Sequence, residues 1–277
     1  MHILITGGTN GIGLSAAKSL LQLGHTLHLT YRSKERLNDL YSYLKAINKV
    51  DAAFFYKCDI SEPDHIKKII VKFRERKISF DCLINNAGVI LFKKSTNSKG
   101  IENVFATNHI GGFYLTKLLL EKNLISSEGR IINVGSSAHK KANLDFNDLD
   151  SKNTKNWYIR YSRSKLCNLL FTLELSKRLK DKSITVNCMH PGIVNTNIAQ
   201  EYRGIMQLIV KLVLKINGIS PTEGADTLVF LTTDKSVSEV SGKYFIKRKV
   251  RSPSSMAVSP EIAKRLWVES ERIVTKF

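Results

Sequence analysis

Short apolar runs rich in β-branched residues alternate along the chain with longer stretches in which apolar residues recur every three or four positions. The short runs predict strands near residues 2–6, 25–31, 52–58, 80–85, 129–135, 183–189 and 242–246. The longer stretches predict helices near 11–23, 34–47, 62–76, 99–121, 156–180, 221–234 and 259–275. Parallel strands need such crossover helices between them. The pattern therefore predicts an α/β fold, a doubly wound parallel sheet with helices on both faces.

Composition adds that this is one ordinary globular domain over residues 1–277. The chain is 43% hydrophobic and 24% charged, and no Pro/Gly/Ser-rich linker divides it. The longest apolar run, 205–219, contains Lys211 and Lys215 and is too short to span a bilayer. No leader pattern opens the sequence, so a cytoplasmic location is expected. The four cysteines are widely spaced, which predicts reduced, buried thiols and no metal site.

The net charge of +19 predicts attraction to phosphates, anionic cofactors, nucleic acid or an acidic membrane surface. Charge alone does not choose among these partners. The basic residues are spread along the chain, and the densest group, 247–251, lacks interleaved aromatic residues. A solvated basic surface is favoured there, and no specific nucleic-acid partner is expected.

A glycine-rich turn follows the first predicted strand and opens the first predicted helix. Glycines there let the backbone approach a pyrophosphate closely, while the amides of the helix N-terminus face the anion. The alternative is a plain strand-to-helix turn, but the place of this turn at the start of a βαβ unit favours a dinucleotide site. The residues assigned to it are Gly7, Thr9, Asn10, Gly11, Ile12 and Gly13.

The end of the second predicted strand carries Arg32 where an NAD-binding sheet normally has a carboxylate. A guanidinium can pair with a 2′-phosphate, which a carboxylate would repel, so Arg32 favours NADP(H) over NAD(H). Ser33 and Lys34 could assist, and the alternative is that Arg32 is a solvated loop residue. Asp59 and Ile60, at the exit of the third strand, are assigned to the adenine end, although Asp59 could also cap the next helix.

Two further groups suggest chemistry. Residues 85–88 place two asparagines before small residues, so that backbone can come close to a flat ligand, though by itself this is also ordinary turn sequence. Tyr161 and Lys165 stand four apart, which puts phenol and ammonium on one helix face. A nearby cation favours the phenolate, so the pKa of Tyr161 is expected to lie below its usual value of about 10. Such a tyrosine can exchange protons near neutral pH.

Taken together, these motifs resemble those of the short-chain dehydrogenase/reductase family over essentially the whole chain. The resemblance rests on the glycine turn at 6–13, the run 85–88, the Tyr161/Lys165 pair and the run 190–192. The chain looks most like the retinol-dehydrogenase-like branch, judging by 143–161, 221–225, 241–245 and 265–267. The resemblance implies a Rossmann-type fold and a hydride-transferring oxidoreductase.

The resemblance also implies a role for each matching residue. Tyr161 would be the general acid/base, Lys165 would hold the nicotinamide ribose, and Ser136 would bind the substrate oxygen, with Ser137 as the alternative register. Asn108 matches the asparagine that supports a proton relay to the lysine, or is a satisfied polar residue. The residues matched to the cofactor-binding segments are Asn86, Ala87, Gly88, Pro191, Gly192, Val194 and Thr196.

The residues near 193–220 match the family's variable substrate lid. Their apolar character, above all at 204–216, predicts a small lipophilic carbonyl or alcohol as substrate. The same basic, apolar segment could touch an anionic membrane surface, or simply pack over the site. The resemblance implies a homodimer or homotetramer through the helices near 99–121 and 156–180, unless their apolar residues face the sheet.

The sequence therefore predicts an NADP-dependent carbonyl reductase or alcohol dehydrogenase. One alternative is a nucleotide-sensing regulatory or scaffold protein of the same fold. The Asn108, Ser136, Tyr161 and Lys165 set argues against it, because a sensor has no use for a proton-transfer group. A second alternative, a nucleic-acid-binding protein, would bind in a salt-sensitive way that survives Tyr161→Phe.

Overall fold

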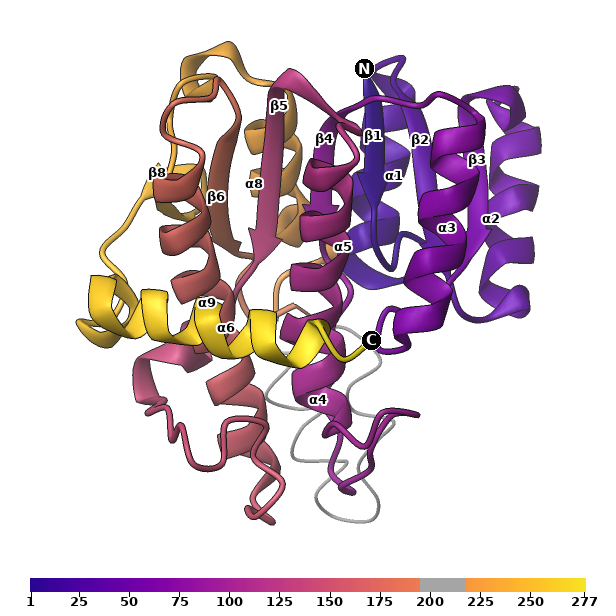
Figure 1. Ribbon diagram of the computed structural model, residues 1–277. Coiled ribbons are helices and arrows are strands. Elements are labelled where there is room, and N and C mark those ends of the chain that lie inside the picture. Colours follow the sequence, from indigo (N-terminus) through magenta and orange to yellow (C-terminus); the bar gives the residue numbers. More distant parts are fainter. Residues whose placement is uncertain (195–217) are drawn as a thin grey trace.

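The protein is built on a single sheet, seen in a computed structural model that describes residues 1–194 and 218–277 (Figure 1). The strand order within this part of the chain is β3-β2-β1-β4-β5-β6-β7-β8. Strands β1 to β7 are parallel and β8 runs antiparallel to β7, which confirms the predicted doubly wound sheet. The bounds are β1 (His2–Ile5), β2 (Thr26–Tyr31), β3 (Ala53–Lys57), β4 (Phe80–Asn85), β5 (Ile125–Val134), β6 (Thr185–His190), β7 (Tyr244–Ile246) and β8 (Lys249–Val250).

Helices cover both faces of the sheet, and each face has its own apolar core. One core is formed with α1 (Gly11–Gln22), α2 (Lys34–Ala46) and α8 (Pro221–Thr233). The other is formed with α3 (Pro63–Glu75), α5 (Gly111–Glu121), α6 (Trp157–Arg178) and α9 (Pro260–Val274). The central strand β1 is apolar on both faces because it faces both cores, and Ile3, Leu4 and Ile5 are fully buried.

Three elements differ from the sequence prediction, the first being β5, which begins at Ile125 and not near 129. The helix expected from residue 99 begins with α4 (Asn103–Phe105), because the Glu102 side chain accepts hydrogen bonds from the amides of Val104 and Phe105 and caps the helix there. It passes through a π-helical stretch, Ala106–Ile110, into α5. The short edge strand β8 was not predicted, since Lys247 and Arg248 turn the chain with positive φ angles and without glycine or asparagine.

The C-terminal helix α9 lies across α5 and α6 (Figure 1). The Trp267 ring packs against Phe113 and Phe171, with centroids 5.0 and 6.0 Å away. The Arg178 guanidinium lies 4.2 Å from the Trp267 ring centroid, and His109 Nε2 is 2.9 Å from Ser270 Oγ. Helix α9 therefore occupies part of the helical face at which the sequence predicts self-association.

Replacing Trp267 by alanine is expected to destabilise the protein by roughly 3–5 kcal/mol, because it empties a buried aromatic site between α5 and α6. Chemical denaturation monitored by circular dichroism measures the change. The matched control is Val268→Ala, whose side chain is 52% exposed on the same helix and should change stability by less than about 0.5 kcal/mol. Equal losses in the two variants would contradict this packing.

Candidate active site

The predicted site residues lie at the C-terminal edge of the parallel strands, beginning with the glycine turn between β1 and α1. Gly7 and Gly11 have φ angles of +66° and +52°, which glycine adopts without strain. A Cβ on Gly13 would come within 2.4 Å of Asn86 Nδ2 and 2.5 Å of the Gly7 carbonyl oxygen. No larger residue fits there. The turn leads directly into the N-terminus of α1, whose backbone amides are the kind of group that binds a pyrophosphate.

Asn86 supports this turn from β4. Its Nδ2 donates to the carbonyl oxygens of Thr6 and Gly7 at 2.8 and 3.1 Å. Thr6 Oγ1 in turn accepts hydrogen bonds from the amides of Asn86 and Ala87, both at 3.0 Å. The Asn86 amide group is thus committed to the backbone of the turn, so its side chain shapes the cradle. Thr6 was not singled out from the sequence, although it directly precedes the glycines.

Arg32 and Asp59, which the sequence assigns to the adenine end of the cofactor, lie next to each other. Arg32 has a 66% exposed side chain, and its NH1 lies 3.7 Å from Asp59 Oδ2. Asp59 also accepts hydrogen bonds from the amide and hydroxyl of Ser61. A cavity of about 150 Å³ is lined by Arg32 and Asp59 among others.

The neighbours of Arg32 and Asp59 are placed differently. Ser33 caps α2 by accepting from the Arg36 amide, and Lys34 is exposed as the first residue of that helix. Ile60 is 5% exposed and belongs to the core beneath α5. Its side chain is therefore not on the open surface of the turn.

Tyr161 and Ser136 come together from α6 and the end of β5. The Ser136 hydroxyl lies close enough to the Tyr161 phenol to favour its phenolate, and Ser136 Oγ accepts from the Ala138 amide at 3.2 Å. The expectation of a lowered tyrosine pKa is wrong for this structure: burial raises the pKa of Tyr161, and the Ser136 hydroxyl only partly opposes that shift. Lys165 Nζ lies 5.8 Å from the centroid of the Tyr161 ring.

Lys165 is held by the end of β5. Its Nζ donates to the Val134 carbonyl oxygen at 2.9 Å, and Asn168 Nδ2 donates to the same oxygen at 3.1 Å. The lysine is 5% exposed, and this burial lowers its pKa to about 8. A Cβ on Gly88 would lie 3.4 Å from Lys165 Nζ, so glycine there leaves room between β4 and the ammonium. Asn168 had not been predicted, although it lies one helical turn after Lys165.

Asn108 lies in the π-helical stretch and ties the exit of β4 to α6. Its Oδ1 accepts from the Val89 amide at 2.7 Å, while Nδ2 donates to the Val89 carbonyl oxygen and to Ser164 Oγ. Ser164 Oγ donates to the Tyr161 carbonyl oxygen. Asn108 is therefore connected through Ser164 to the helical turn that carries Tyr161. These contacts are compatible with both interpretations from the sequence, a proton relay to Lys165 and a satisfied polar residue.

The segment after β6 approaches the glycine turn from the other side. Gly192 has a φ of +95°, and Val194 forms a parallel bridge with Ile219. A Cβ on Gly224 would meet Val194 Cγ2 at 2.7 Å and Ile12 Cγ1 at 3.6 Å, which places Val194 and Ile12 against the start of α8. Pro191 is half-buried. Thr196, most of the lid at 193–220 and the segment 204–216 lie outside the described residues.

His139 contacts the backbone of Ser136, a contact that could not be predicted from the sequence. Its Nδ1 is 2.6 Å from the Ser136 carbonyl oxygen, and its Nε2 accepts from the Ser254 amide at 3.2 Å. With Nε2 accepting, Nδ1 carries the proton and donates to Ser136. Burial lowers the pKa of His139, which keeps the ring neutral in this role.

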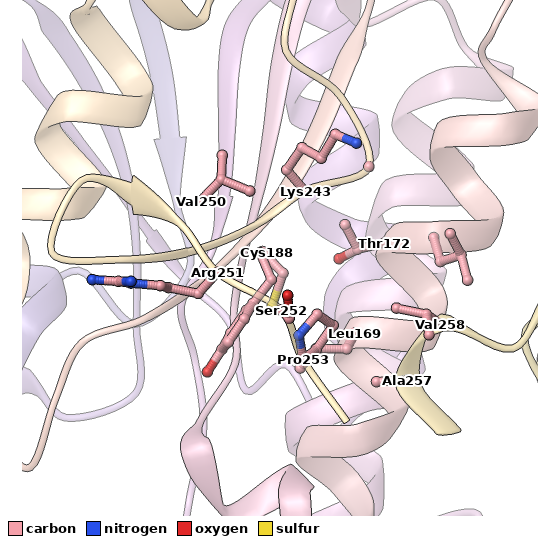
Figure 2. Close-up of a pocket in the computed structure, with 13 residues that line it drawn as sticks. Leu169, Thr172, Cys188, Lys243, Val250, Arg251, Ser252, Pro253, Ala257 and Val258 are labelled. Atoms are coloured by element: carbon pink, nitrogen blue, oxygen red, sulfur yellow. The ribbon is translucent and has the colours of Figure 1, made fainter. Parts of the chain in front are cut away.

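A second cavity, of about 410 Å³, lies between α6 and the β7–β8 edge (Figure 2). Leu169, Cys188 and Val258 are among its lining residues, and none of the predicted site residues is. Lys243 and Arg251 point in opposite directions in Figure 2. Burial raises the pKa of the Cys188 thiol to about 12, so it stays protonated at neutral pH. This cavity is separate from the convergence of Ser136, Tyr161 and Lys165.

Comparison with known proteins identifies the family. The model of the short chain dehydrogenase family matches residues 1–205. The chain belongs to the short-chain dehydrogenase family. Human retinol dehydrogenase 13 is 34% identical, the alignment covering 98% of this chain and 84% of that protein. A chloroplastic short-chain dehydrogenase, TIC 32 A of Brassica napus, is 33% identical over 98% of this chain and 88% of its own length. The retinol-dehydrogenase-like branch predicted from the sequence is confirmed.

Solved structures support the fold. A Mycobacterium paratuberculosis protein matches with a TM-score of 0.78 and 24% identity, over 99% of this chain and 93% of that one. A Burkholderia cenocepacia short-chain dehydrogenase in complex with NADP matches with a TM-score of 0.67 and 22% identity, covering 88% and 94% of the two chains. Family membership makes the chain an oxidoreductase and supports a nicotinamide cofactor. The glycine turn before α1, with positive φ at Gly7 and Gly11, is the kind of turn that fits such a dinucleotide.

Oxidoreductase activity in the reducing direction is expected to decline above about pH 8. With its pKa near 8, Lys165 loses its positive charge as the pH rises past that value, whereas Tyr161, whose pKa is raised, keeps its proton. The pH profile of kcat/KM, which reports the free enzyme, should show a single limb falling about tenfold per unit. Circular dichroism at each pH controls for unfolding. A profile that stays flat to pH 10 would contradict a role for the Lys165 charge in the reaction.

Proposed function

We propose that the protein is an NADP(H)-dependent oxidoreductase that interconverts a lipophilic aldehyde or ketone and its alcohol. The observation that carries this proposal is the convergence of Ser136, Tyr161 and Lys165 from β5 and α6. In this arrangement the hydroxyls of Ser136 and Tyr161 are available to the substrate oxygen, and the Lys165 ammonium lies near the Tyr161 ring. Family membership gives the reaction type, and the retained triad argues for catalysis over a purely nucleotide-sensing role.

In the reducing direction, Tyr161 donates its phenolic proton to the carbonyl oxygen while Ser136 donates a hydrogen bond to the same atom. The glycine turn at Gly7, Gly11 and Gly13 would hold NADPH, whose chemistry would be the donation of a hydride to the carbonyl carbon. A raised tyrosine pKa suits a proton donor, because the phenol remains protonated at neutral pH. The Lys165 ammonium stabilises the phenolate that forms, and it would hold the nicotinamide ribose. In alcohol oxidation the Tyr161 phenolate would accept the proton of the alcohol, while Ser136 and Lys165 would keep their roles.

The preference for NADP(H) rests on Arg32. Its mostly exposed guanidinium at the end of β2, 3.7 Å from Asp59, is free to turn toward a 2′-phosphate at the cost of only a solvent-screened ion pair. Ser33 and Lys34 add a hydroxyl and a second positive charge beside it. A short-chain dehydrogenase in complex with NADP and a blue fluorescent protein in complex with NADPH share the fold, which is compatible with this choice.

A lipophilic substrate is supported by the relatives' names. They include retinol dehydrogenases and a human polyprenol dehydrogenase that is 30% identical over 96% of this chain. The apolar segment 204–216 is proposed to cover such a substrate and to allow peripheral contact of a cytoplasmic protein with an anionic membrane, helped by the net charge of +19. Within the described ranges, no helix combines the length and apolarity that crossing a bilayer demands. We also propose that the protein forms a homodimer or a homotetramer.

Replacing Tyr161 by phenylalanine is expected to lower kcat for carbonyl reduction by about a hundredfold to ten-thousandfold, because the proton donor is lost while the ring is kept. NADPH consumption is measured against a panel of aromatic, aliphatic, retinoid and steroidal carbonyls, with the alcohols and NADP⁺ in parallel. The NADPH dissociation constant should stay within about threefold of the wild-type value. Full turnover in the variant would contradict the role of Tyr161, and no turnover by the wild type in either direction would contradict the proposed function.

Replacing Arg32 by alanine is expected to raise KM for NADPH by about tenfold to a hundredfold, because a charge-assisted pair with the 2′-phosphate is lost. KM for NADH should hardly change, since NADH has no such phosphate. Arg36→Ala is the matched control, because it removes an exposed positive charge from the same helix start. If Arg36→Ala raises the NADPH KM equally, the effect is one of general surface charge and Arg32 does not read the phosphate.

A further inference from the structure

Arg160, the residue directly before Tyr161, is fully buried although arginine is normally a surface residue. Its NH1 and NH2 groups donate to four backbone carbonyl oxygens in two separate loops. The acceptors are Leu91 and Phe92 at 2.6 and 3.1 Å, and Thr154 and Lys155 at 3.4 and 3.0 Å. One guanidinium therefore joins the loop that leaves β4 to the loop that enters α6.

The positive charge of Arg160 is balanced by Glu102. The Nε atom lies 3.3 Å from Glu102 Oε1, and neither side chain has exposed surface. The other carboxylate oxygen, Oε2, accepts from the amides of Val104 and Phe105 at 2.8 and 3.0 Å. A buried pair held on both sides in this way fixes geometry, because each charge loses its compensation if the other moves.

The two loops that Arg160 joins bring a pair of aromatic rings together. Phe92, whose carbonyl oxygen Arg160 holds, meets Trp157 edge to face, with ring centroids 4.9 Å apart and an interplanar angle of 66°. Trp157 is the first residue of α6 and directly follows the cap residue Asn156. The rings thus lie where the two clamped loops converge.

Helical spacing relates this aromatic pair to the reacting groups. Trp157, Tyr161 and Lys165 follow one another at intervals of four, so they share one face of α6. Lys165 stands at the end facing Gly88 and the strand ends. Trp157 stands one turn beyond Tyr161 in the opposite direction. A substrate whose oxygen meets Tyr161 would extend its body toward that turn.

We propose that Trp157 and Phe92 form a wall for the flat, lipophilic body of the substrate, and that the Arg160–Glu102 pair positions this wall. The inference rests on the proposed function, which it deepens by naming the specificity-determining residues. Trp157 contacts substrate, whereas Arg160 acts through the two loops and is a positioning residue. The wall selects extended conjugated or aromatic carbonyls over short aliphatic ones, since a flat ring face gives contact at low entropic cost.

The test compares kcat/KM for all-trans-retinaldehyde with kcat/KM for butanal, using NADPH. Trp157→Ala is expected to lower the ratio of the two by about tenfold or more, mostly through KM for retinaldehyde. Arg160→Lys should lower it in the same direction, because one ammonium cannot serve two loops. Ile159→Ala is the matched control: its side chain is 37% exposed on the same helical turn, and its ratio should stay within twofold of the wild-type value. A ratio within twofold in Trp157→Ala would overturn the wall.

Two further measurements keep the outcomes separate. If Arg160→Lys does not fold, as judged by circular dichroism, Glu102→Gln replaces it and should show the same loss of selectivity; a selectivity unchanged in a folded variant overturns the positioning role. If the wild type reduces no carbonyl, the proposed function fails, and the dissociation constant of all-trans-retinol is measured by fluorescence titration. A tenfold weaker binding in Trp157→Ala then supports the wall, and equal binding overturns it.

Discussion

The pairing of β1 with β4 is the contact on which the rest of the site depends. Here the strand order reverses, so the chain leaves β1 toward α1 on one face of the sheet and leaves β4 toward α5 on the other. Thr6 and Asn86 join these exits by hydrogen bonds to each other's backbone, which keeps the glycine turn at a fixed distance from Gly88. Gly88 faces Lys165, and Lys165 holds the end of β5 through Val134. Strand pairing therefore sets the spacing between the glycine turn and Tyr161.

Much of this arrangement could be predicted from the sequence because it depends on residues that are close to one another along the chain. The seven parallel strands follow apolar runs, and the glycine turn, the Tyr161/Lys165 spacing and the family motifs locate the site. The predicted helix starts near α2, α3 and α9 agree with the structure within a residue or two. Residues buried on both sides, as in β1, leave little freedom in where a strand begins and ends.

Features that depend on distant partners could not be predicted. Glu102 and Arg160 are 58 positions apart, and each alone looks like a surface charge. The β7–β8 turn uses two basic residues at positive φ, stabilised in part by Arg248 Nε donating to Asp226 at 2.7 Å, and no turn signal marks it. The pKa of Tyr161 was predicted from one neighbouring charge, whereas desolvation by the whole surrounding fold dominates it. Local spacing finds which groups meet, but burial decides how they titrate.

The enclosed Glu102–Arg160 pair also has a consequence for how this sequence can evolve. Losing either partner alone strands a charge with no exposed surface, which costs roughly 3–5 kcal/mol and approaches the whole stability margin of many domains. An exchange of both for apolar residues of similar volume can be nearly neutral by comparison. Reaching an apolar pair one substitution at a time therefore requires passing through a destabilised protein. Descendants of this chain should keep both residues or change both together.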